Sequence, residues 1–301
     1  MEKENFFIGS QYEVHKERDY IVVKDTEQIS YLKISGNIKD RILHNLKDAE
    51  TIILLNTLFS KQSRAEGKKL ICIKNPYQKR RLRFFSNCLD ALCKISSIIF
   101  VIMVGFLIGI LSIKYQVIEN RHFYIKEVLW VIINILVHEA GHIFLCEYSG
   151  RVVHSYGIKM NYGMPMFYVD TTDICMAGIN DRVKTSLGGV YFNSFLCIVS
   201  GLFGLFFKSA YLLECSRISF FFMGSNLIPF WRLDGYYILS DCLEINNLNK
   251  ESKRMFKEFP LKSRDRKNFF LVIYFTSRKI FFLIVILRFT EQIMSYVSTI
   301  F

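Results

Sequence analysis

The chain has 301 residues, of which 51% are hydrophobic, and its mean hydropathy is +0.23. Its 39 Lys and Arg residues outnumber its 27 Asp and Glu residues and give a formal net charge of +12. So apolar a composition excludes intrinsic disorder and is unusual for a soluble domain. The charge could indicate either nucleic acid or a membrane, so its position along the chain decides between them.

Two basic blocks carry the excess charge. Residues 61–83 hold 9 basic residues and 1 acidic residue, and residues 250–267 hold 8 and 3. Because each block borders an apolar region, both are expected on the cytosolic side of a membrane. Anionic lipid is then the expected partner of these blocks, and nucleic acid is not. The eight cysteines stand singly without a C-x-x-C pair, which argues against a disulfide scaffold or a zinc ribbon.

Residues 1–70 are expected to form a small soluble α+β module. Residues 19–35 alternate like strands with a turn around Asp25, and residues 37–46 and 49–59 have helical spacing. The first 30 residues lack the basic and apolar regions of a cleavable signal, which predicts a cytosolic N-terminus. A basic juxtamembrane linker is predicted for residues 71–90, and a transmembrane domain for residues 91–301.

The rest of the chain contains five apolar stretches and predicts a mainly α, multi-pass membrane protein. Residues 91–113, with one charge, are long enough to cross a bilayer, and residues 127–148, 186–207, 211–231 and 269–289 are similarly apolar. The fourth stretch is interrupted at Gly224, Asn226 and Pro229, and such a break is tolerated only inside protein or beside water. The fifth contains Arg278 and Lys279, so its true span is expected to begin near Ile280.

The second apolar helix carries the sequence H-E-x-x-H at residues 138–142. This spacing places His138 and His142 one turn apart on one helix face, with Glu139 beside them. Two imidazoles suit zinc, whose catalytic sites take three protein ligands and leave a fourth position to water. Glu139 could then take a proton from that water. The alternatives are a chance match, a structural metal, or histidines hydrogen-bonded inside a bundle.

A third zinc ligand has to come from elsewhere in the chain. Glu147 lies five residues beyond His142 and points away from the histidine face, whereas Asp234 follows the interrupted helix and precedes Gly235. A carboxylate oxygen suits zinc, so Asp234 is the better candidate. The alternative for Asp234 is a helix cap or a turn residue.

Three motifs together resemble the site-2 protease family of intramembrane zinc metalloproteases. They are H-E-x-x-H, Asn226-x-x-Pro229-x-x-x-x-Asp234-Gly235, and Gly189-Val-Tyr-Phe-Asn193, which is similar to the G-P-x-x-N of the family. Their order and spacing agree over about residues 127–245. Val190 stands where the family usually has Pro, which affects the expected bend of that helix.

The resemblance implies a three-helix metalloprotease core with flanking transmembrane helices. It also implies a Zn²⁺ cofactor held by His138, His142 and Asp234, Glu139 as general base, and Asn193 as a polar group that faces the site. Hydrogen bonding between helices is the alternative role of Asn193.

Residues 165–173 alternate like a strand, where the family has a membrane-embedded hairpin that pairs with an extended substrate. The expected substrate-binding residues lie here: Tyr168, Asp170, Thr171, Thr172 and Asp173. The alternative for both aspartates is that they form turns.

Within the family, the chain resembles the bacterial peptide zinc metalloproteases found with ribosomally made, modified peptides, because they share a stretch like Tyr168-Val-Asp-Thr-Thr-Asp173. The first 70 residues resemble winged-helix-like domains that recognise leader peptides, although a simple cytosolic cap is also compatible. The expected function is hydrolysis of a peptide bond in a membrane-associated protein or a small prepeptide. The alternative is a noncatalytic zinc- or peptide-binding membrane accessory protein with a role in immunity or transport.

Overall fold

The computed structural model describes residues 5–8, 11–16, 20–25, 30–35, 37–44, 49–62, 69–74, 90–115, 125–161, 164–245, 247–258 and 266–300. The chain divides into two compact units, Met1–Leu227 and Ile228–Phe301. Residues 63–68 and 75–83 of the first basic block and 259–265 of the second lie outside the described residues, and so does most of the predicted linker.

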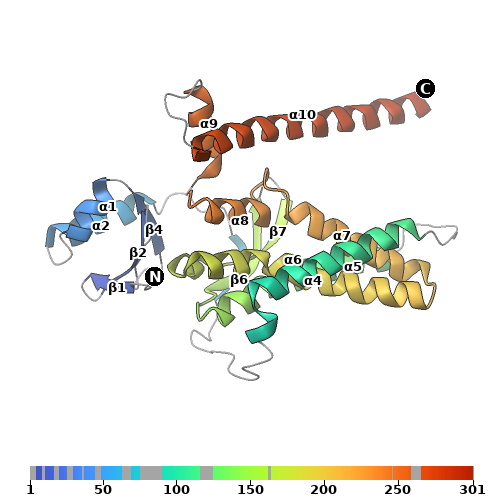
Figure 1. Ribbon diagram of the computed structural model, residues 1–301, viewed down its shortest axis with the longest axis horizontal. Helices are drawn as coiled ribbons and strands as arrows, with labels where there is room; N and C mark the ends of the chain where they lie inside the picture. The colour runs from blue at the N-terminus through green and yellow to red at the C-terminus, as the bar shows by residue number, and fades with distance from the viewer. Residues whose placement is uncertain are drawn as a thin grey trace. The chain divides into compact units, whose positions relative to one another are not determined.

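The first unit begins with a four-stranded antiparallel sheet in the order β1-β2-β3-β4 (Figure 1). Its strands are β1 (Asn5–Ile8), β2 (Tyr12–Lys16), β3 (Tyr20–Asp25) and β4 (Ser30–Ser35). Two helices follow, α1 (Asn37–His44) and α2 (Ala49–Gln62), and both contact β4. These elements, residues 5–62, are called the N-terminal module below.

Strand β3 is buried on both of its faces. Because successive side chains of a strand point to opposite faces, Ile21 and Val23 enter the core of the N-terminal module. Val22 lies on the other face and packs against Met176, which is far away in the sequence. The second face of the sheet is therefore covered by another part of the first unit.

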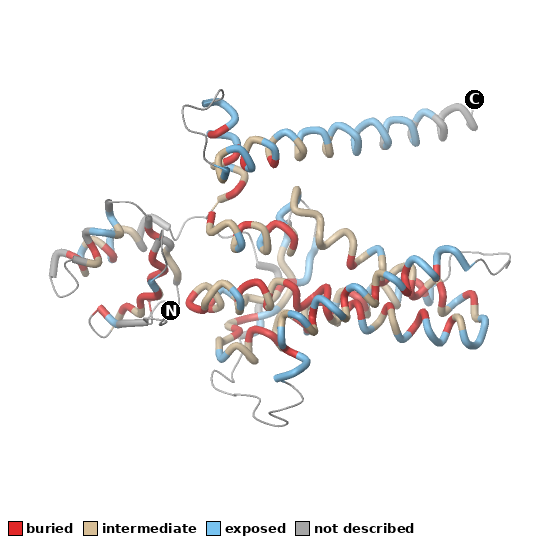
Figure 2. The backbone as a smooth tube through the Cα atoms, in the orientation of Figure 1, coloured by how far each residue is buried: buried red, intermediate tan, exposed pale blue. Residues whose placement is uncertain are grey.

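Four helices form a bundle in the same unit: α4 (Ile95–Lys114), α5 (Ile125–Tyr148), α6 (Ile179–Phe206) and α7 (Ala210–Asn226). Helix α6 contacts each of the other three, and half of its most apolar segment is buried, a larger share than in α4 or α5, so it is the central helix. Figure 2 shows buried residues along the contacts between these helices. Glycine allows close approach at Gly109, where a Cβ would lie 2.2 Å from the Phe220 ring.

Three further strands form a second antiparallel sheet in the order β5-β6-β7. They are β5 (Lys69–Lys74), β6 (Ser155–Asn161) and β7 (Met164–Val169). The strand predicted for residues 165–173 thus ends at Val169, and the 3-10 helix η1 (Thr172–Met176) leads from it towards α6. Among the described residues, β7 pairs only with β6, so its other side is a sheet edge.

The second unit contains α8 (Asp234–Cys242), α9 (Leu248–Lys257) and α10 (Arg266–Ile300). Its core joins the three helices, and the hydroxyl of Tyr274 on α10 donates to the carbonyl of Pro229 at 2.9 Å. Beyond this core, most of α10 is exposed (Figure 2). Buried hydrophobic residues form the core of the unit: Tyr236, Ile245, Leu248, Met255, Leu271 and Tyr274.

Four described helices are long and apolar enough to cross a membrane: α4, α5, α6 and residues 266–292 of α10. Helix α7 has 17 residues and is shorter than these four. The fifth predicted stretch begins within a helix that starts at Arg266, before the expected start near Ile280. The fold confirms the predicted class, a mainly helical chain with several helices able to span a membrane and a small N-terminal β-sheet module.

Candidate metal centre

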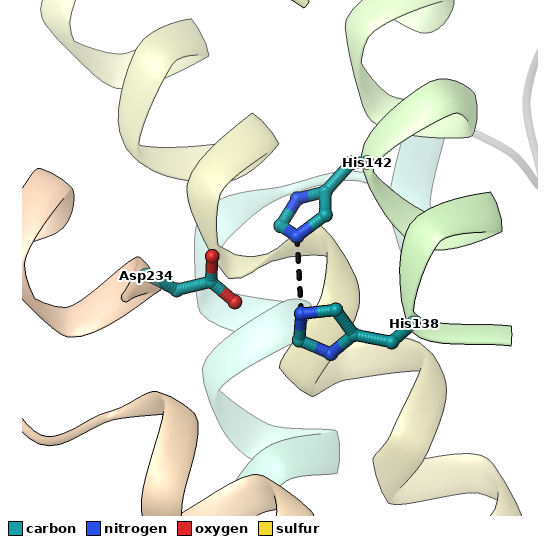
Figure 3. A group of neighbouring side chains, drawn as sticks. All are labelled: His138, His142 and Asp234. Atoms are coloured by element: carbon teal, nitrogen blue, oxygen red, sulfur yellow. Dashed lines mark hydrogen bonds between the residues drawn. The ribbon is translucent and has the colours of Figure 1, made fainter. Parts of the chain in front are cut away.

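The two histidines of H-E-x-x-H meet on one face of α5. Because α5 is regular from Ile125 to Tyr148, residues four apart lie one turn apart on the same face. The Nε2 atom of His138 lies 3.2 Å from the Nε2 atom of His142, and the two rings point these atoms at each other (Figure 3). His138 is 8% exposed and His142 is half-buried.

This separation fits two ligands of one zinc ion. Zn–N bonds of 2.0 to 2.1 Å at the tetrahedral angle place two ligand nitrogens about 3.3 to 3.4 Å apart. The observed 3.2 Å agrees with that value within a few tenths of an ångström. The donor set on α5 is therefore suited to zinc in both chemistry and spacing.

A backbone carbonyl fixes the tautomer of His142. Its Nδ1 atom lies 2.8 Å from the carbonyl oxygen of Thr185 on α6. Because a carbonyl can only accept, Nδ1 must carry a proton, and in the neutral imidazole Nε2 then carries the lone pair that a metal requires. Metal-bound histidines are oriented in this way by the group on their second nitrogen.

Asn193 on α6 stands in the same relation to His138. Its side-chain amide lies 3.4 Å from Nδ1 of His138, and Asn193 is fully buried. With the amide nitrogen facing the ring, the amide oxygen has no hydrogen-bond partner. With the two amide atoms exchanged, Oδ1 would accept from Nδ1–H, and Nε2 of His138 would carry the lone pair that a metal requires. The predicted residue therefore lies beside the histidines.

Glycines let α5 and α6 approach closely enough for these contacts. A Cβ at Gly141 would lie 2.2 Å from the carbonyl oxygen of Gly188, and a Cβ at Gly189 would lie 2.3 Å from the ring of His138. Real Cβ atoms are not found so near to other atoms. The Gly189 position thus leaves the space that the His138 ring occupies.

Two carboxylates, Glu139 and Asp234, also belong to the site predicted from the sequence. Glu139 follows His138 on α5 and is half-buried. Asp234, in the second unit, is the first residue of α8 and is also half-buried, while Gly235 beside it is buried. The predicted interruption at Asn226 and Pro229 is present: α7 ends at Asn226, and the chain is not helical around Pro229 before α8 begins.

The predicted substrate-binding residues have different surroundings. Tyr168 is on β7 and is 8% exposed. Asp170 accepts hydrogen bonds from the backbone and the hydroxyl of Thr172, which matches the turn-forming alternative. Asp173 is only 2% exposed, and its carboxylate accepts hydrogen bonds from Lys24, Tyr31 and the backbone of Val152.

Sequence reasoning missed Thr185, Lys24 and Tyr31. Thr185 acts through its backbone carbonyl, which every residue has, so no sequence pattern could have identified it. Lys24 and Tyr31 lie on strands of the N-terminal module and contact residues more than 100 positions later. The alternation of residues 19–35 predicted strands there but gave no indication of what these two side chains contact.

The chain is 31% identical over 128 residues to "Putative peptide zinc metalloprotease protein YydH" of Bacillus subtilis (strain 168). The alignment covers 41% of this chain and 50% of the relative, so the chain spans about half the length of the curated relative that it matches. No protein-family model and no solved structure matches the chain. The resemblance to bacterial peptide zinc metalloproteases, predicted from the motifs, is confirmed by this distant relative.

Proposed function

We propose that this protein is an intramembrane zinc metalloprotease that hydrolyses a peptide bond in a membrane-associated protein or a small precursor peptide. The observation that carries the proposal is the pair of Nε2 atoms 3.2 Å apart on α5, one of which has its tautomer fixed by Thr185. The similarity to a protein described as a peptide zinc metalloprotease supports the same activity.

The proposed zinc ligands are His138, His142 and Asp234, the three side chains labelled in Figure 3. Each offers one ligand atom, two imidazole nitrogens and one carboxylate oxygen. This set leaves a fourth position of a tetrahedral ion open, as catalytic zinc sites require. Bound zinc supplies a Lewis acid that acidifies water and polarises the scissile carbonyl.

Glu139 is the proposed general base. It follows His138 on α5 and is therefore the residue next to a proposed ligand in the sequence. It takes a proton from the attacking water and transfers it to the leaving amine nitrogen. Asn193 holds the ring of His138 through Nδ1 and so acts as a positioning residue.

The proposed peptide-binding element is the edge of β7 that pairs with no other described strand, and β7 contacts α5. A helical substrate has to unwind before its peptide bond can be attacked, and strand addition to an edge holds the opened backbone. Tyr168, Asp170, Thr171 and Thr172 lie on β7 or directly after it and are proposed to contact the substrate. The carboxylate of Asp173 is occupied by hydrogen bonds from Lys24 and Tyr31, so we assign it a different role below.

The proposed location is the cell membrane, with several crossings and a cytosolic N-terminus. The four candidate spans support a membrane location, and the basic blocks at residues 61–83 and 250–267 support the orientation. The N-terminal module is then on the cytosolic side, where it could bind a leader peptide, and the basic borders would face anionic lipid rather than nucleic acid.

Coexpression with candidate peptides tests the proposal. Wild type and Glu139→Gln are each produced with the small peptides encoded nearby, and the peptide masses are compared. The wild-type chain is expected to shorten one peptide, while Glu139→Gln retains zinc and leaves every peptide intact. Glu147→Gln is the matched control, because Glu147 is a half-buried glutamate on the same helix that the proposal leaves out of the chemistry.

Two results would contradict the proposal. Cleavage by a zinc-containing Glu139→Gln variant would remove Glu139 from the mechanism. Intact peptides in the presence of a fully metallated wild-type chain would favour the noncatalytic zinc- or peptide-binding protein.

A further inference from the structure

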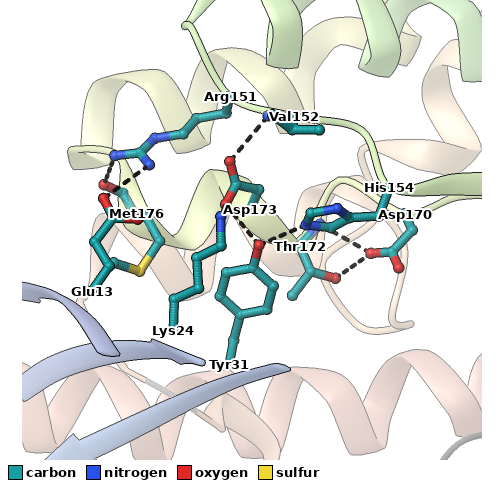
Figure 4. A network of polar contacts seen from close by, with 10 residues as sticks. All are labelled: Glu13, Lys24, Tyr31, Arg151, Val152, His154, Asp170, Thr172, Asp173 and Met176. Atoms are coloured by element: carbon teal, nitrogen blue, oxygen red, sulfur yellow. Dashed lines mark hydrogen bonds and ion pairs between the residues drawn. The ribbon is translucent and has the colours of Figure 1, made fainter. Parts of the chain in front are cut away.

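Asp173 lies at the centre of a buried polar contact between the N-terminal module and the segment that follows β7 (Figure 4). Its carboxylate accepts from Nζ of Lys24 at 2.7 Å and from the hydroxyl of Tyr31 at 2.6 Å. It also accepts from the backbone N–H of Val152 at 3.0 Å, in the loop before β6. Asp173 therefore joins three segments that are distant in the sequence.

His154 also belongs to this polar contact, because it is hydrogen-bonded to Tyr31. Its Nε2 atom lies 2.7 Å from the hydroxyl of Tyr31. Because that hydroxyl donates its one proton to Asp173, Nε2 of His154 has to donate to Tyr31. Burial lowers the pKa of His154, and nearby Lys24 lowers it further against the opposite effect of Asp170 and Asp173. The lowered pKa favours the neutral form of this imidazole.

The surroundings of Asp173 favour its ionised carboxylate form. Burial alone would raise the pKa of its carboxyl, but the hydrogen bonds from Lys24, Tyr31 and Val152 outweigh burial and lower it. Burial and the neighbouring Asp173 raise the pKa of Tyr31, so the phenol remains a donor. The ion pair of Lys24 and Asp173 is therefore a stable feature at neutral pH.

Apolar packing and a second ion pair enlarge the contact. Val22 and Met176 are buried against each other, with Tyr31 and Cys175 partly buried around them. Arg151 lies 3.6 Å from Glu13 of β2 and also donates to the carbonyl of Met176. The apolar contact and the two ion pairs together favour one orientation of the sheet of the N-terminal module. A displaced sheet would leave charged groups of these pairs without their partners.

The same contact closes the base of the β6–β7 hairpin. His154 directly precedes β6, and Asp170 directly follows β7. Their backbones continue the ladder, since His154 N–H donates to the carbonyl of Asp170 at 3.1 Å and Asp170 N–H donates to that of Ser155 at 2.7 Å. The N-terminal module therefore contacts the two chain segments at which the hairpin is anchored.

We propose that the N-terminal module is a positioning element that holds the base of the β6–β7 hairpin through Asp173, Lys24 and Tyr31. This inference rests on the proposed function, in which the edge of β7 receives an extended peptide. The module thereby sets the orientation of the substrate-binding edge. A peptide that is bound to the module therefore reaches that edge from a fixed position relative to β7.

Hydrogen exchange of the full chain in detergent tests the mechanical part without any substrate. Lys24→Met and Asp173→Asn are expected to speed exchange in β3, β4, β6 and β7 by about tenfold or more, because each leaves a buried partner unpaired. The double variant should exchange no faster than the single ones, since both remove the same interaction. Lys24→Arg should restore slow exchange.

Two further variants make the result interpretable. Tyr31→Phe keeps the ring and removes only the hydroxyl, so it tests the contact if Asp173→Asn fails to fold. Glu251→Gln removes a carboxylate from the Arg254–Glu251 pair on α9 and should leave exchange in β6 and β7 unchanged. Faster exchange confined to the module, or no change in any strand, would overturn the inference.

Peptide cleavage separates this inference from the proposed function. Once coexpression identifies a cleaved peptide, Lys24→Met should raise its KM at least several-fold and leave kcat close to the wild-type value. If hydrogen exchange in β6 and β7 is faster in Lys24→Met but its KM is unchanged, the positioning role is overturned. If no peptide is cleaved at all, the exchange result still decides whether the module holds the hairpin.

Discussion

Nδ1 of His142 lies 2.8 Å from the carbonyl oxygen of Thr185, so the neighbouring helix α6 determines which nitrogen of the neutral ring carries the lone pair that can bind a metal. At the corresponding nitrogen of the second histidine, His138, lies the side-chain amide of Asn193. The two rings are thus oriented by groups of different kinds on the same helix, one backbone carbonyl and one side chain. Only the second can be removed by mutation.

Asn193→Ala should weaken zinc binding. Loss of the amide removes the group that holds Nδ1 of His138, and comparable changes around metal sites cost about 10- to 100-fold in affinity. Competition with a coloured chelator measures this effect on the purified chain. Asn134→Ala is the control, because Asn134 is equally buried in α5 but donates to the carbonyl of Trp130 instead. Equal affinities of the wild type and Asn193→Ala would contradict the positioning role.

Gly189→Ala should displace the ring of His138. The added Cβ would lie 2.3 Å from that ring, and the resulting overpacking costs about 1 to 3 kcal/mol. Zinc content measured by metal analysis and the thermal midpoint should both fall. Gly224→Ala provides the comparison, since a Cβ there meets nothing within 4 Å. Normal zinc content in Gly189→Ala would show that the ring does not depend on this space.

Acid pH should release the N-terminal module in two steps. The pKa of His154 is lowered in the folded chain, so stability falls as the pH drops below about 6.5, where the unfolded imidazole takes up a proton. The pKa of Asp173 is also lowered, so its contribution is present above about pH 3.9 and is lost as the pH falls through the folded value. Both groups therefore weaken the contact on acidification.

Limited proteolysis across this pH range measures the release. Cleavage between the module and the bundle should increase from pH 7 to pH 5, and His154→Gln should remove most of that increase. The other charged groups around the ring are Lys24, Asp170 and Asp173, and none of these is replaced in the variant. An identical pH profile in His154→Gln would assign the first step to another group.

Local patterns predicted most of the helices and the histidine pair. The H-E-x-x-H spacing placed His138 and His142 together because helical geometry depends only on nearby residues, and the structure confirms their contact. Helix α6 begins at Ile179, seven residues before the predicted start, since its first turns are polar and carry no apolar signal.

Long-range pairings could not be predicted in the same way. β5 pairs with β6 although it lies at the border of the predicted module and linker. Asp173 fits a turn or a substrate contact equally well by sequence, and only the folded chain shows Lys24 and Tyr31 beside it. Such contacts depend on how separate elements pack, which no local periodicity encodes.

Hydrolysis in ¹⁸O-labelled water by the purified, zinc-loaded chain tests the central claim most directly, with the peptide identified by coexpression as substrate. The account predicts one ¹⁸O atom in the new carboxyl terminus with wild type, and no product with Glu139→Gln at equal zinc content. Product without the label, or cleavage that survives complete removal of zinc, would contradict it.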